Sequence, residues 1–268
     1  MQGAKTELIG PAPRIAVEHM GTGPLLVFLH GIGGNRTNWR DQLPVFARRF
    51  HAVAWDGRGY GQSDDYDGPL SYDDFCRDLV RVLDHFKADK AHLVGLSMGG
   101  FIAQDFYGHY PQRVASLVLA DTRPGWEEAF DPVGREEFLR LRLKPLQEGK
   151  SVAEMAPAVA RSLMGTSAGE DVYARLVESM SALHKESYMK SIAARGHWKP
   201  VLDPKSVKVP TLVVVGAEDR LTPPAMAKSI AEAIPGAQLA VIPAAGHLSN
   251  IEQPAAFNEV VLDFLANP

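Results

Sequence analysis

One pentapeptide of the chain, Gly95-Leu96-Ser97-Met98-Gly99, has the residue types of a nucleophilic turn. An apolar run typical of a buried strand precedes it, and a run with helical spacing follows it. A serine displayed on such a sharp strand-to-helix turn needs a strained backbone, and side chains two residues to either side would clash, so both positions require glycine. Gly95 and Gly99 meet that requirement. We therefore predict that Ser97 is a nucleophile.

A serine nucleophile needs a histidine base and an acid that orients the histidine. Behind this kind of turn the acid comes next in the chain and the histidine comes last. Asp219 follows the apolar run 211–215, and His247 follows the apolar run 238–242. Because the carboxyl ends of parallel strands share one edge of a sheet, both side chains are expected within reach of Ser97. We predict that Asp219 is the acid and that His247 is the base.

Two other acidic residues bear on this assignment. Asp121 follows the apolar run 116–120, at the same expected edge of the sheet, and it is the alternative candidate for the acid. Glu218 adjoins Asp219, and we expect its side chain to point the opposite way.

The loop after the first predicted buried strand can complete such a site. It reads His-Gly-Ile-Gly-Gly over residues 30–34, and glycine lets a backbone approach a substrate closely. We expect the N–H groups of Ile32 and Met98 to stabilise a developing oxyanion, since Met98 begins a helix whose dipole favours negative charge there. His30 comes before the base position in the expected chain order, so we predict that it fixes this loop by hydrogen bonds.

The elements that must position these residues follow from alternating patterns along the chain. Short apolar runs alternate with amphipathic stretches, as in a mainly parallel sheet flanked by crossover helices, which is an α/β fold. The apolar runs are too continuous for half-exposed strands, so we expect both faces of the sheet to be covered. They span 25–29, 51–55, 92–96, 116–120, 211–215 and 238–242.

One stretch, residues 123–200, interrupts this alternation. It contains helical patterns and no strand-like run, so we predict a helical cap inserted into a core domain made of residues 1–122 and 201–268. Because the insertion leaves one strand and returns before the next, it should lie over the carboxyl edge of the sheet, where such sheets bind ligands. We therefore expect Trp126 and Trp198, both in the insertion, to bind the substrate.

Composition and charge favour a small-molecule partner. Of the 268 residues, 46% are hydrophobic and 22% are charged, and the formal net charge is -4, which gives no electrostatic reason to bind nucleic acid or an anionic membrane. No apolar run reaches the length of a membrane span, and the N-terminus lacks the apolar core of a secretory signal. With Cys76 as the sole cysteine, we expect a cytoplasmic protein. Its oligomeric state stays open, homo-oligomers included.

No cofactor or metal is implied. The glycine-containing stretch 56–64 resembles a phosphate-binding loop, but it lacks both G-x-G-x-x-G spacing and a Gly-Lys-Ser/Thr ending, so a structural turn is expected. No Cys or His set has the spacing of metal ligands, and no H-E-x-x-H motif occurs.

Taken together, the motifs of this chain resemble those of α/β-hydrolase-fold serine esterases and lactonases, most of all the group similar to 3-oxoadipate enol-lactonases. The resemblance runs through residues 30–34 with Trp39, 56–64, 95–100, 216–224 and Gly246-His247. It covers the chain except the insertion. It implies an α/β-hydrolase fold and hydrolysis of a carboxylic ester or lactone through an acyl-enzyme, without a cofactor.

Two other functions stay open. Carbon–carbon hydrolases of ring-cleavage products have a similar core, often with Gly-Asn-Ser-Met-Gly-Gly at the turn, and have proline in the oxyanion loop, whereas this chain has Leu96 and Gly34 at those places. Some proteins with a similar fold are small-molecule receptors. Ser97, Asp219 and His247 together argue against a purely binding role.

Overall fold

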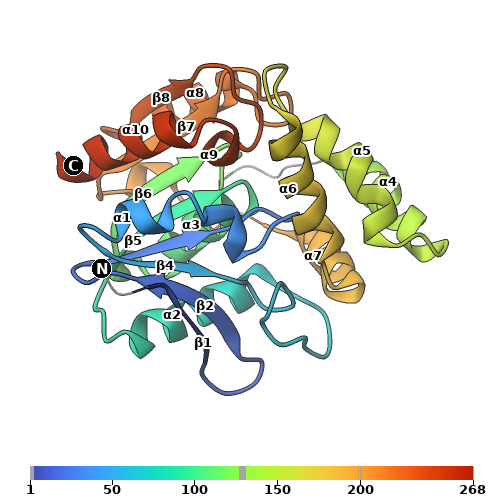
Figure 1. Ribbon diagram of the computed structural model, residues 1–268, viewed down its shortest axis with the longest axis horizontal. Coiled ribbons are helices and arrows are strands. Elements are labelled where there is room, and N and C mark those ends of the chain that lie inside the picture. The colour runs from blue at the N-terminus through green and yellow to red at the C-terminus, as the bar shows by residue number, and fades with distance from the viewer. Residues whose placement is uncertain (1–2, 127–130, 200, 268) are drawn as a thin grey trace.

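The computed structural model describes residues 3–126, 131–199 and 201–267, and in this part of the chain one sheet of eight strands forms the centre (Figure 1). The strand order is β1-β2-β4-β3-β5-β6-β7-β8. The two pairs that involve β2 are antiparallel and all others are parallel. The strands are β1 (Lys5–Ile9), β2 (Ile15–Met20), β3 (Leu25–Leu29), β4 (His51–Trp55), β5 (Ala91–Leu96), β6 (Val114–Ala120), β7 (Thr211–Gly216) and β8 (Gln238–Ile242).

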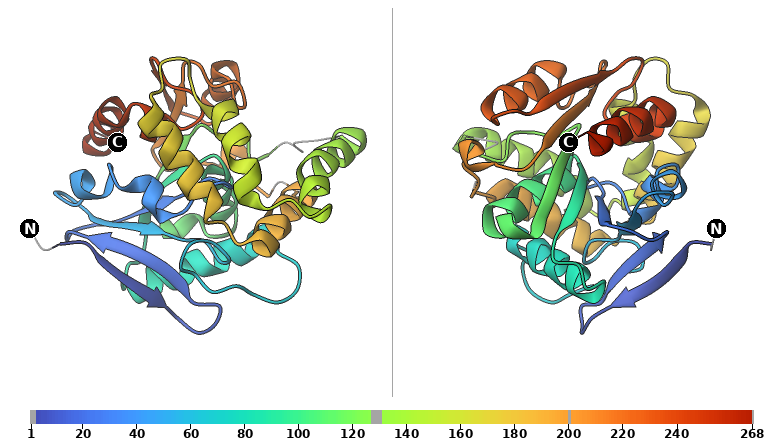
Figure 2. Two further views of the ribbon diagram at one scale, coloured as in Figure 1. Left: turned by 45° about the vertical axis from the view of Figure 1, so that its right-hand side comes forward. Right: turned by 90° about the vertical axis from the view of Figure 1, so that its left-hand side faces the viewer.

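Helices cover both faces of this sheet, as the right-hand view of Figure 2 shows. Helices α2, α3 and α8 pack on one face, and α1 and α10 pack on the other, so the sheet separates two apolar cores. These helices and the remaining short ones outside residues 123–200 are η1 (Arg36–Trp39), α1 (Leu43–Phe46), α2 (Tyr72–His85), α3 (Met98–His109), η2 (Pro111–Arg113), η3 (Pro204–Ser206), α8 (Pro224–Ala233), α9 (Ser249–Glu252) and α10 (Pro254–Ala266).

The mainly parallel α/β architecture confirms the fold class predicted from the sequence. Every residue of β3 and of β7 is buried, which matches their continuous apolar runs. The expectation of full coverage is wrong for β8, an edge strand in which Leu239 is 40% and Val241 is 45% exposed. The apolar run shows that β8 is a strand, but its neighbours in the sheet decide whether its two faces are covered.

In the described residues, four α-helices follow β6 and precede η3 in the chain, and they lie beyond one end of the sheet in space (Figure 1). Within this group α5 packs on α6, and α4 packs on α7. Of the stretch 123–200, residues 127–130 and 200 lie outside the described part of the chain. The four helices are α4 (Pro132–Gln147), α5 (Val152–Leu163), α6 (Glu170–Ser181) and α7 (Lys185–His197).

Parallel pairing brings the functional loops together. The carboxyl ends of β3, β5, β6, β7 and β8 lie at one edge of the sheet, so the loops that follow them meet there.

Within the described residues, no helix has both the length and the apolar character needed to cross a bilayer.

Candidate active site

Ser97 stands on a strained turn between β5 and α3. Its φ of 53° and ψ of −111° lie outside the regions that side-chain-bearing residues normally adopt. A Cβ on Gly95 would lie 2.3 Å from the carbonyl oxygen of Gly99, and a Cβ on Gly99 would lie 2.1 Å from that of Leu29. The predicted need for glycine on both sides of the serine is confirmed, because neither backbone contact leaves room for a side chain.

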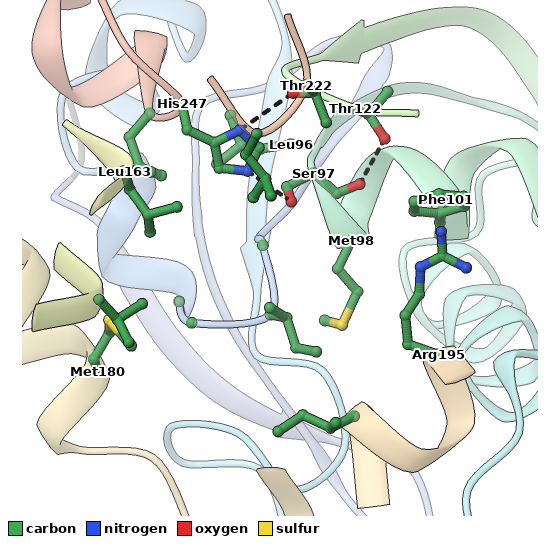
Figure 3. A pocket seen from close by; sticks show the side chains of 18 of the residues that line it. Leu96, Ser97, Met98, Phe101, Thr122, Leu163, Met180, Arg195, Thr222 and His247 are labelled. Atoms are coloured by element: carbon green, nitrogen blue, oxygen red, sulfur yellow. Dashed lines mark hydrogen bonds between the residues drawn. The ribbon is translucent and has the colours of Figure 1, made fainter. Parts of the chain in front are cut away.

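The structure brings Ser97, His247 and Asp219 together at the carboxyl edge of the sheet. Figure 3 shows His247 beside Ser97 at the cavity. His247 Nε2 lies 3.0 Å from Ser97 Oγ, and His247 Nδ1 lies 2.9 Å from Asp219 Oδ2. Asp219 follows β7 and His247 follows β8, and both side chains are buried. A proton on Nδ1 that is donated to the carboxylate leaves Nε2 to accept the serine hydroxyl proton.

The loop after β7 holds Asp219 as an anion. Its Oδ1 accepts the N–H groups of Leu221 at 2.8 Å and Thr222 at 2.9 Å, and its Oδ2 accepts the Thr222 hydroxyl at 2.5 Å. Burial alone would raise the pKa of Asp219, but the hydrogen bonds from His247 and Thr222 outweigh it and leave this pKa below its usual value. Thr222 was not predicted from the sequence, although a hydroxyl three residues after an aspartate is typical of a turn closed by the side chain.

Asp121, the alternative acid, is buried nearby and makes a different set of contacts. Its Oδ1 accepts the N–H of Gly216 at 2.9 Å, and its Oδ2 accepts the hydroxyl of Ser249 at 2.6 Å. Burial, helped by the negative charge of Asp219, raises the pKa of Asp121 to about 7. These contacts tie the ends of β6 and β7 to the residues that follow His247. Glu218 accepts hydrogen bonds from the backbone N–H and the hydroxyl of Thr166.

The two predicted oxyanion donors border the same cavity as Ser97. Met98 is the first residue of α3, so its N–H has no acceptor within the helix. Ile32 lies in a turn closed by a 2.9 Å hydrogen bond from the Gly34 N–H to the Gly31 carbonyl. That these two N–H groups stabilise an oxyanion stays a prediction.

His30 holds the loop 30–34 by hydrogen bonds, in agreement with its predicted structural role. Its Nε2 accepts the N–H of Gly57 at 3.0 Å, and its Nδ1 lies 2.8 Å from the Gly31 carbonyl, to which it donates. Burial lowers the pKa of His30, so the ring is neutral and serves as a hydrogen-bond brace.

A cavity of about 210 Å³ lies between Ser97 and the helices α4–α7. Its walls are mainly apolar and come from both the core and these helices. Figure 3 shows Leu163 and Met180 on one side of the cavity and Arg195 beside Phe101 on the other. Apolar side chains at the cavity include Ile32, Phe138, Val159, Leu163, Leu176, Met180 and Ile192.

Three arginines also line this cavity, whereas its lining contains no aspartate or glutamate among the described residues. They are Arg123 after β6, Arg142 on α4 and Arg195 on α7. The Arg195 guanidinium lies 3.8 Å from the centre of the Phe101 ring, and the side chain is buried. Burial lowers the pKa of Arg123 and of Arg195, so a bound anion would offset the cost of burying these two charges.

Neither tryptophan that was expected to bind substrate forms a wall of this cavity. Trp198 lies behind Phe101, at 5.1 Å between ring centres, and donates its indole N–H to Asp105 Oδ2 at 2.6 Å. Trp126 is half-buried and packs against the apolar core. The expectation that these two tryptophans bind the substrate is therefore wrong for this cavity, which Phe101 and Arg195 line instead.

Metal ligands are not clustered in the part of the chain that the structure describes. No group of three or more His, Cys, Asp or Glu side chains there is placed to hold a metal ion.

Comparisons with known proteins agree with this architecture. Residues 24–254 match the family described as alpha/beta hydrolase fold. The 3-oxoadipate enol-lactonase 2 of Acinetobacter baylyi is 28% identical over 89% of this chain and 87% of its own. The 2-hydroxy-6-oxononadienedioate/2-hydroxy-6-oxononatrienedioate hydrolase of Escherichia coli is 31% identical over 98% of this chain and 94% of its own. A thermophilic esterase from Thermogutta terrifontis superposes with a TM-score of 0.86 at 28% identity, covering 99% of this chain and 98% of that one.

Proposed function

This chain belongs to the alpha/beta hydrolase family, and from that premise we propose that it hydrolyses a carboxylic ester or lactone of a small molecule. Ser97 is the proposed nucleophile, His247 the base and Asp219 the acid. The observation that carries the proposal is the placement of the His247 ring, within 3.0 Å of Ser97 Oγ and 2.9 Å of Asp219 Oδ2, at the end of an apolar cavity.

In the proposed mechanism His247 Nε2 takes the hydroxyl proton as Ser97 Oγ attacks the carbonyl carbon. The N–H groups of Ile32 and Met98 stabilise the oxyanion of the tetrahedral intermediate. When the intermediate collapses, the carbon–oxygen bond of the ester breaks and His247 gives its proton to the departing oxygen. Water then attacks the acyl-enzyme with His247 as base, which releases the acid and restores the Ser97 hydroxyl.

We propose further that the insertion 123–200 acts as a cap that encloses the substrate. What supports this role is the large share of the cavity wall that α4–α7 contribute, from Phe138 on α4 to Arg195 on α7. An enclosed apolar site strengthens the electrostatic interactions at the reacting carbonyl because it keeps water away.

The arginines at the cavity favour a substrate with an anionic group. Arg123, Arg142 and Arg195 supply positive charge at a wall that carries no acidic side chain within the described lining. Guanidinium groups bind carboxylates by short, charge-assisted hydrogen bonds. We therefore propose a small ester or lactone that carries a carboxylate and binds it with one or more of these arginines.

Cleavage of a carbon–carbon bond is the second candidate function. The observation that favours it is the 31% identity, over nearly the whole length of both chains, to the Escherichia coli hydrolase. Leu96 and Gly34 stand where the carbon–carbon hydrolases described above have asparagine and proline, and these differences favour the ester and lactone reaction.

The test combines covalent labelling with paired substrates. A fluorophosphonate should label Ser97, as located by peptide mass spectrometry, and the enzyme should hydrolyse p-nitrophenyl esters or lactones faster than ring-cleavage dienoates. Each substrate ester that carries a free carboxylate is compared with the neutral compound of the same length in which that carboxylate is a methyl ester. Labelling without any turnover would support the binding-protein alternative, whereas faster cleavage of the dienoates would support the carbon–carbon reaction.

A further inference from the structure

The segment 163–166 consists of the last residue of α5 and the start of the connection to α6, and it lies against the two loops that carry Asp219 and His247. The backbone N–H of His247 donates to the Leu163 carbonyl at 2.8 Å. Arg220, next to Asp219, donates to the Met164 carbonyl at 3.0 Å. The segment is therefore bonded to the loop of the acid and to the loop of the base.

Glu252 connects this segment to both sides of His247. Its Oε2 accepts the N–H of Gly165 at 2.8 Å and the N–H of Gly246 at 3.0 Å, and its Oε1 accepts the N–H of Leu248 at 3.3 Å. Glu252 is 8% exposed, and hydrogen bonds to a buried carboxylate are stronger than those between neutral groups. One side chain thus holds the peptide groups that flank the histidine and a peptide group of the segment.

The two backbones also touch directly. A Cβ on Gly246 would lie 2.4 Å from the Gly165 nitrogen and 2.6 Å from the Leu163 carbonyl oxygen. A side chain at Gly246 would push the segment and the histidine loop apart. Gly246 therefore allows two chain segments that lie about eighty residues apart in the sequence to approach each other closely.

The segment also reaches the substrate cavity. The side chains of Leu163 and Leu248 both line the cavity, and each adjoins one of the peptide groups described above. A ligand that displaces the Leu163 side chain would therefore also displace the Leu163 carbonyl, which accepts the backbone N–H of His247.

We propose that Glu252 is a positioning residue for His247, and that through Gly165 it makes the alignment of the imidazole with Ser97 depend on the segment between α5 and α6. This inference rests on the proposed function, since it assigns His247 the role of base. Filling of the cavity beneath α5 and α6 is thereby coupled to the geometry of proton transfer.

Glu252→Gln is the sharpest variant because it keeps size and one acceptor oxygen. The glutamine NH₂ group replaces one of the two carboxylate oxygens and cannot accept a hydrogen bond. If it replaces Oε2, the bonds from the Gly246 and Gly165 N–H groups are lost, and if it replaces Oε1, the bond from the Leu248 N–H is lost. A displacement of the base by about 1 Å can cost about 100-fold in rate, so we expect kcat on a neutral ester and the rate of fluorophosphonate labelling to fall about 10- to 100-fold. KM should change less than about threefold, because Glu252→Gln substitutes no residue that lines the cavity.

Three comparisons separate positioning from a structural role. Glu154→Gln is the matched control, because Glu154 also accepts a backbone N–H, that of Ser151 at 2.7 Å, but at the exposed start of α5. Glu252→Asp keeps the charge and should recover part of the labelling rate. A Glu252→Gln enzyme that melts at a lower temperature yet labels at the parental rate while folded would overturn the proposal.

A measurement on the unaltered enzyme covers the case in which Glu252→Gln does not fold. Hydrogen exchange of peptides that span 163–166 and 244–252 is followed before and after phosphonate labelling of Ser97. We expect exchange to slow in both peptides together, because one carboxylate holds both backbones. Slower exchange in 244–252 alone would contradict the coupling, and absence of labelling in the parent would reject the proposed function and this inference with it.

Discussion

Asp121 accepts two hydrogen bonds from Ser249, from the hydroxyl at 2.6 Å and from the backbone N–H at 3.1 Å. Ser249 comes two residues after His247, so this buried carboxylate supports the histidine loop from the side of β6. Asp219, by contrast, bonds the imidazole itself. Two carboxylates at neighbouring strand ends thus act on the same loop at different points.

Asp219→Asn and Asp121→Asn should therefore have unequal effects. Loss of the Asp219 charge removes stabilisation of the imidazolium and favours the wrong tautomer, so we expect kcat to fall about 10²- to 10⁴-fold at neutral pH. Asp121→Asn should cost much less, since an amide oxygen can still accept one of the existing bonds. Both variants are compared on one ester after circular dichroism confirms folding. If Asp121→Asn were the inactive one, the acid would be assigned to the wrong strand.

Ser97→Ala should abolish nearly all turnover without loss of the fold. Removal of the nucleophile is expected to lower kcat by about 10⁴-fold or more, and to prevent fluorophosphonate labelling altogether. Alanine fits the same turn, so the melting temperature should stay close to that of the parent. Substantial hydrolysis by the folded variant would remove Ser97 from the mechanism.

Arg195→Gln should affect anionic substrates selectively. We expect KM for a carboxylate-bearing ester to rise about tenfold or more, because a charge-assisted contact is lost, while KM for its neutral counterpart changes less than about threefold. Arg140→Gln is the control, since Arg140 lies on the exposed side of α4 and pairs with Glu137. Equal changes for both substrates would show that Arg195 only shapes the cavity.

Asp105 should make the free energy of unfolding depend on pH. Burial raises the pKa of Asp105 to about 7 from its usual value of 3.8, so the folded state binds more protons than the unfolded state between these values. Stability from this group is present at low pH and is lost as the pH rises towards about 7. Asp105→Asn should remove that loss, because asparagine can still accept the indole N–H of Trp198.

The measurement is the melting temperature of parent and variant from pH 5 to pH 8. The difference, variant minus parent, should grow with pH by a few degrees, given about 2–4 °C per kcal/mol for a domain of this size class. Asp84→Asn, at an exposed aspartate on α2, serves as the control. A difference that stays constant with pH would mean that Asp105 is ionised throughout this range.

The sequence by itself was sufficient for the fold class and for the group of residues at the site. Strand and helix periodicities are local, and so is the requirement for glycine around Ser97, which follows from the backbone of one turn. Parallel strands then force the loops after β5, β7 and β8 to one edge, so Asp219 and His247 could be selected by their place in the chain.

Only the tertiary structure decided which side chains form the cavity and which stand behind it. Helical spacing shows that residues of α4 and α7 have an apolar face, but it does not show what that face packs against, so Arg195 and Phe101 lie in front of Trp198 contrary to expectation. The same holds for the exposed face of β8 and for the bond from Gly165 to Glu252, which spans 87 residues. Such contacts depend on how distant elements dock, and no local pattern in the sequence encodes that arrangement.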